Sequence, residues 1–112
     1  MSAESFLVFY GCRQAVEAGI IDQLEDRSHP TLMAARKAGM ETYWGNFSAD
    51  GGEEYFLFIG KKIGVFGAEH QSAAILTKED FLALASTVEA KLASLQITAG
   101  VGMYTAWHPD IS

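Results

Sequence analysis

The spacing of apolar residues along the first part of the chain predicts a strand followed by a helix. Residues 6–10 are an unbroken run of apolar and aromatic side chains, which is typical of a strand buried on both faces. Within residues 13–25 the apolar positions recur as on one side of a helix. An alternative stays open for this segment, namely a tight turn at residues 11–13 followed by a returning strand over residues 14–17.

Two more helices are predicted from capping residues and apolar spacing. Pro30 suits the first turn of a helix over residues 31–38, which Gly39 ends in the left-handed conformation that glycine adopts easily. The other helix begins after Thr77, because Thr77 and Asp80 stand three apart like a capping box with a shortened acid. A continuous apolar stripe follows, so we expect this helix to be amphipathic and to lie on a sheet.

Aromatic strand formers fill the middle and the end of the chain. Residues 41–47, 55–59 and 63–67 predict three antiparallel strands in a row, the last two joined as a hairpin at residues 60–62. Residues 101–107 predict a final strand. This order favours an α+β fold with a mostly antiparallel sheet of about five strands and two or three helices on one face. We expect a ferredoxin-like split βαβ arrangement with one extra hairpin strand.

Length and charge narrow the class of protein. With 112 residues the chain has room for one domain, so residues 1–112 are predicted to fold as a single unit. The net charge is −6 and the basic residues are scattered, which argues against nucleic-acid binding. The sequence shows neither a secretory leader nor a membrane-spanning run, and a lone cysteine fits a reducing compartment. We expect a cytoplasmic protein that binds no membrane.

The aromatic residues suggest self-association. They make up 12% of the chain, and most of them lie on the predicted strands. Successive aromatic positions place rings on both faces of a sheet, so the face without helices is expected to expose a large apolar patch. A second subunit is the simplest cover for such a patch, and we therefore expect a homodimer.

Cys12 is the first candidate for chemistry. A thiol between a strand and a helix, beside Arg13, would have a lowered pKa. However, position 18 is alanine where the cysteine-phosphatase loop needs arginine, and a redox pair would need a second cysteine. A Cys–His nucleophile pair with one of the three histidines stays open. We interpret Cys12 chiefly as a small buried hydrophobic residue at a strand end.

Metal and phosphate sites are poorly supported. Glu69, His70, His108 and Asp110 could supply ligands, but they have no close-spaced ligand motif, and we predict neither metal nor cofactor. The glycines and lysines of residues 60–67 lack the spacing of a phosphate loop. Glycines within a strand instead indicate a bulge or a close approach of two backbones.

We therefore expect a non-catalytic, self-associating module that binds a small molecule or a protein through an aromatic-rich sheet face. The alternative is a small enzyme with a shallow site between subunits, which would use Tyr43, Trp44 and either His70 or His108. The expected ligand-binding residues are Cys12, Tyr43, Trp44, His70, Trp107 and His108.

Overall fold

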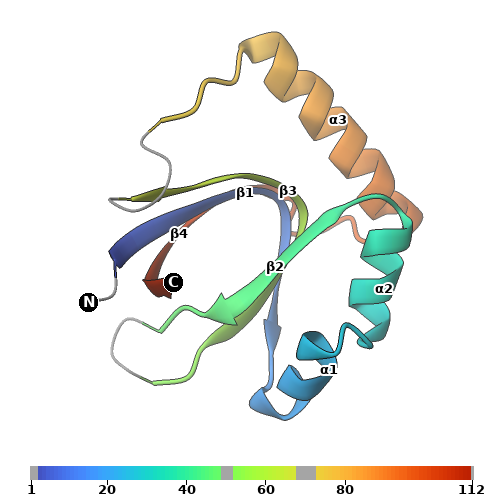
Figure 1. The fold of residues 1–112 in the computed structure, drawn as a ribbon. Helices are drawn as coiled ribbons and strands as arrows, with labels where there is room; N and C mark the ends of the chain where they lie inside the picture. The colour runs from blue at the N-terminus through green and yellow to red at the C-terminus, as the bar shows by residue number, and fades with distance from the viewer. Residues whose placement is uncertain (1–2, 49–51, 68–72, 112) are drawn as a thin grey trace.

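The chain folds into a curved antiparallel sheet with helices along one side (Figure 1). The computed structural model describes residues 3–48, 52–67 and 73–111, and within these residues the sheet has four strands in the order β2-β3-β1-β4. The strands are β1 (Ala3–Val16), β2 (Glu41–Asn46), β3 (Tyr55–Gly67) and β4 (Gly102–Ile111). The helices are η1 (Ala18–Ile20), α1 (Ile21–Glu25), α2 (Pro30–Lys37) and α3 (Lys78–Ser94). The α+β class is confirmed, with four described strands in place of about five.

The expected hairpin at residues 60–62 is wrong, because β3 continues through it as one strand. Lys61 and Lys62 pair with Tyr10 and Phe9 of β1, and a bulge after this point absorbs one extra residue. A tight turn here would have left the second half of β1 without a partner. The long β1 strand instead supplies a partner along the whole of β3. Because both strands continue, their backbone N–H and C=O groups can form hydrogen bonds with each other.

Both interpretations of residues 13–25 are also corrected. The chain neither turns back at Gly11 nor becomes helical at Arg13, because β1 runs on to Val16 and the helical segment begins only at Ala18. Residues 12–16 alternate across the sheet and pair with residues 55–59 of β3. The long-range pairing with β3 therefore outweighs the local helical spacing.

The predicted helix ends are confirmed. His29 precedes Pro30 as the first residue of α2, and its Nδ1 accepts a hydrogen bond from the backbone N–H of Thr31 at 3.3 Å. Gly39 ends this helix with a positive φ of 82°. At α3 the backbone N–H of Asp80 donates to the hydroxyl of Thr77 at 3.1 Å.

The two faces of the sheet have separate cores. The helix-covered face packs side chains of β1 and β3 against α1, α2 and α3, with Cys12, Leu57 and Ile59 at its centre. On the helix-free face Leu7, Phe9 and Phe58 are completely buried, although no described helix covers them. Curvature of the sheet brings in rings from other strands: the centroids of Phe58 and Tyr104 lie 5.9 Å apart. The expected exposure of this face is therefore wrong for the described residues.

None of the described helices combines the length and apolar character required to cross a bilayer.

Candidate functional site

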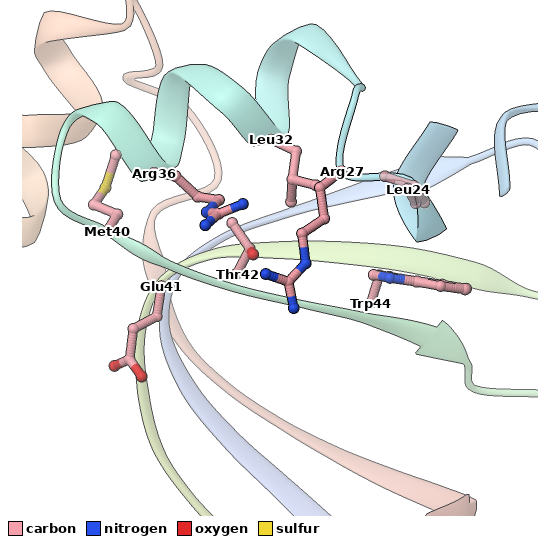
Figure 2. Close-up of a pocket in the computed structure, with 8 residues that line it drawn as sticks. All are labelled: Leu24, Arg27, Leu32, Arg36, Met40, Glu41, Thr42 and Trp44. Atoms are coloured by element: carbon pink, nitrogen blue, oxygen red, sulfur yellow. The ribbon is translucent and has the colours of Figure 1, made fainter. Parts of the chain in front are cut away.

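A cavity of about 350 Å³ opens between α2 and β2 on the helix-covered face, and we call it the arginine cavity (Figure 2). Its volume lies within the range of roughly 300–1,000 Å³ that is usual for small-molecule sites. The described lining residues are Leu24, Arg27, Leu32, Arg36, Met40, Glu41, Thr42 and Trp44. Three segments of the chain therefore meet there: the end of α1, the inner side of α2 and the first half of β2.

Arg27 reaches the cavity from an unusual backbone position. It follows α1 with φ of +59°, a left-handed conformation that normally favours glycine. Its N–H donates to Leu24 O at 3.1 Å, and the N–H of Ser28 donates to Gln23 O at 2.9 Å, which together complete the helix-ending Schellman motif. An arginine here costs backbone energy that a glycine would avoid, and such strain is frequent at functional sites.

The guanidinium groups of Arg27 and Arg36 both point toward β2 from the other side of the cavity (Figure 2). Within the described part of the chain, neither group has a hydrogen bond or a carboxylate partner. The chain as a whole has a net charge of −6, so carboxylates are plentiful elsewhere. Two positive charges therefore face the same opening without internal neutralisation.

The opposite wall is formed by β2. Thr42 and Trp44 point into the cavity, and the indole of Trp44 lies along the strand (Figure 2). Glu41 points to the other side of β2, where its carboxylate binds the Lys61 ammonium at 2.9 Å. Its negative charge is thus engaged away from the guanidinium groups. The cavity offers two exposed guanidinium groups, one hydroxyl and a flat apolar surface.

The predicted site residues do not gather in one place. Tyr43 and Trp44 are neighbours in β2, so their side chains lie on opposite faces of the sheet. Tyr43 belongs to the helix-free face, and only Trp44 lines the arginine cavity. Trp107 lies on β4 at the opposite edge of the sheet, with β3 and β1 between it and β2.

Cys12 lies in the middle of β1, within the core of the helix-covered face. It is 2% exposed, and burial raises the pKa of its thiol. Arg13 points to the other face, where its guanidinium sits 4.3 Å from the ring centroid of Phe56 and 5.3 Å from that of Tyr104. The expected arrangement of a thiol at a helix terminus beside a guanidinium is therefore absent. Cys12 is a buried residue as interpreted, but the expected position at a strand end is wrong, because β1 runs on to Val16.

No histidine is among the described residues that line the arginine cavity. His29 caps α2, His70 lies outside the described residues, and His108 is described only by its place in β4. Among the described residues, no three histidine, cysteine, aspartate or glutamate side chains lie close enough together to hold a metal ion.

Sequence reasoning missed Arg27 and Arg36 as site residues. No sequence signal singles out Arg27, because Gln96 also ends a helix as a non-glycine residue with positive φ and does not line the cavity. For Arg36 the placement near a helix end explains the residue by itself, since positive charge is favourable there. Only the packing of α2 over β2 brings the two arginines together.

Comparison with known protein families, with curated proteins and with solved structures found no match.

Proposed function

We propose that this protein is a non-catalytic module that binds a small molecule with a carboxylate or phosphate group in the arginine cavity. The supporting observation is the pair of guanidinium groups that face one opening without an internal partner among the described residues. Guanidinium groups match the oxygens of carboxylate and phosphate in geometry as well as in charge. The flat ring of Trp44 would pack against the apolar part of such a ligand.

The lining residues favour binding over catalysis. Arginine stays protonated at any physiological pH, so neither guanidinium can exchange a proton in a reaction. Glu41 is paired with Lys61 on the other side of β2, and Thr42 has no general base beside it among the described lining residues. A single subunit holds Tyr43 and Trp44 on opposite faces of the sheet, so the alternative of an enzyme site between subunits would have to take these two side chains from different subunits.

Removing both guanidinium charges should strongly weaken anion binding. We expect Arg27→Gln/Arg36→Gln to weaken binding by about a hundredfold or more, because each charged hydrogen-bonding contact contributes roughly 1.5–3 kcal/mol. A Trp107→Phe background leaves Trp44 as the sole tryptophan, so its fluorescence reports on the cavity. Inorganic phosphate and octanoate, titrated separately, distinguish the two anionic groups.

The matched control is Lys37→Gln/Lys78→Gln, which removes the same amount of charge from residues that do not line the cavity. This control should bind as the parent does. Equal losses in both double variants would mean that only net charge matters, and a lack of saturable binding by either anion would contradict the proposed function.

We also propose, as finer features, a ferredoxin-like fold and a cytoplasmic location. The strand order is β2-β3-β1-β4, and helices connect β1 to β2 and β3 to β4. This topology supports the ferredoxin-like fold. The buried free thiol of Cys12 supports the cytoplasmic location, since reducing compartments keep cysteines unpaired. An experimental structure tests the fold, and cell fractionation tests the location.

Self-association as a homodimer is a separate proposal, and its support is the edge of the sheet. β4 is an edge strand in the described structure, and its residues 102–107 have no charged side chain. Uncharged edges favour pairing with another strand, and Met103 adds an exposed apolar side chain there. Light scattering after size exclusion should give twice the mass of the chain, and Met103→Lys should give the monomer. A monomeric parent at high micromolar concentration contradicts the dimer.

A further inference from the structure

We propose that the bound anion has an aliphatic tail and that this tail lies in a second cavity along α3. This inference rests on the proposed function, because the arginine cavity would hold the anionic group. The second cavity, which we call the α3 cavity, has a volume of about 320 Å³ and opens between α3 and the beginning of β2. It is lined by Gly39, Met40, Glu41, Gly60, Lys61, Ala83, Leu84, Thr87, Val88 and Lys91.

The two cavities share a wall. Met40 and Glu41 line both of them, so the two cavities adjoin at the first residues of β2, and a ligand held in both would have to pass the Met40 side chain. The side chain of Met40 is nearly buried between the two spaces. Methionine is unbranched and adjusts its shape easily, so it suits a wall along which a flexible chain passes.

The charges divide the two cavities into different chemical environments. In the α3 cavity the Lys61 ammonium binds Glu41 at 2.9 Å, and Lys91 Nζ donates to the carbonyl of Gly39 at 3.2 Å. These polar groups are therefore already engaged, and α3 contributes Ala83, Leu84 and Val88 as an apolar wall. Uncompensated charge at one end and apolar surface at the other match an amphipathic acid.

Straight-chain carboxylates of increasing length provide the test. Acetate, butanoate, hexanoate, octanoate and decanoate are titrated below the concentrations at which they form micelles, again by Trp44 fluorescence. We expect affinity to rise about fourfold for each added methylene until the α3 cavity is filled, as burial of a methylene predicts. Ala83→Phe fills the α3 cavity from an exposed position, so this variant should remove the dependence on chain length.

The control is Ala90→Phe, which places the same ring on an exposed position of α3 that lines neither cavity. It should keep the parent's chain-length series, and both variants should bind phosphate as the parent does. If phosphate binds and the arginines matter but affinity is independent of chain length, the tail site is wrong while the proposed function stands. If no anion binds, the proposed function itself fails. Octanol, which has the tail without the charge, should bind more weakly than octanoate.

Discussion

Gly11→Ala is expected to lower the free energy of unfolding by about 3 kcal/mol or more, or to prevent folding altogether. Gly11 and Gly60 face each other across β1 and β3 with φ of +151° and +148°. A Cβ on Gly11 would lie 2.0 Å from the carbonyl oxygen of Ile59, and one on Gly60 would lie 2.2 Å from that of Tyr10. Both contacts are with backbone, which cannot rotate away as a side chain can.

Gly102→Ala is the matched control for this prediction. Gly102 pairs with Gly11 on the other side of β1, but an added Cβ there would meet no atom within 4 Å. Denaturant unfolding followed by circular dichroism measures both variants, and Gly102→Ala should remain close to the parent. Similar stabilities for Gly11→Ala and Gly102→Ala would show that the close approach of β1 and β3 is not required by the fold.

Arg27→Gly should stabilise the fold while it weakens ligand binding. The left-handed backbone at Arg27 costs an L-residue roughly 1–2 kcal/mol, which glycine avoids. We therefore expect a gain of about 0.5–1 kcal/mol in the free energy of unfolding after the greater flexibility of unfolded glycine is subtracted. The same change removes one of the two guanidinium groups, so affinity for octanoate should fall by about tenfold to a hundredfold.

Gln96→Gly separates the two effects. Gln96 follows α3 with φ of +64°, and the N–H groups of Gln96 and Ile97 donate back to Ala93 O and Leu92 O in the same motif. It lines neither cavity, so Gln96→Gly should gain stability without any change in affinity. Thermal unfolding measures the stability of both variants, and octanoate titration measures their affinity. A loss of stability in Arg27→Gly would mean that Arg27 supports the fold, and unchanged affinity would remove it from the site.

Local signals in the sequence predicted α2, α3 and β2 well because their ends are fixed by neighbouring residues. Thr77 caps α3 through a hydrogen bond three residues away, and Gly39 ends α2 through its own backbone freedom. Such interactions span a few residues, so they can be inferred without knowledge of the rest of the chain.

The site was predicted less well, because its residues are assembled by packing. Trp44 was expected to bind a ligand and does line the arginine cavity. Arg27 and Arg36 had no recognisable motif, and their shared opening exists only because α2 lies over β2. Tyr43 was grouped with Trp44 from its position in the sequence, although alternation along a strand sends the two side chains to opposite faces.

The sequence by itself determined the α+β class, the limits of the capped helices and the aromatic character of the strands. The tertiary structure decided where β1 and β3 end, because each runs on as long as the other offers backbone partners, and the facing glycines Gly11 and Gly60 allow the two strands to approach closely. It also decided which surfaces are buried. Curvature of the sheet closes the helix-free face around Phe9 and Phe58, and the opening with unpaired charge lies instead beneath α2. The burial of these rings and the approach of the two arginines depend on contacts between residues far apart in the chain. The local pattern of apolar and polar residues does not encode such contacts.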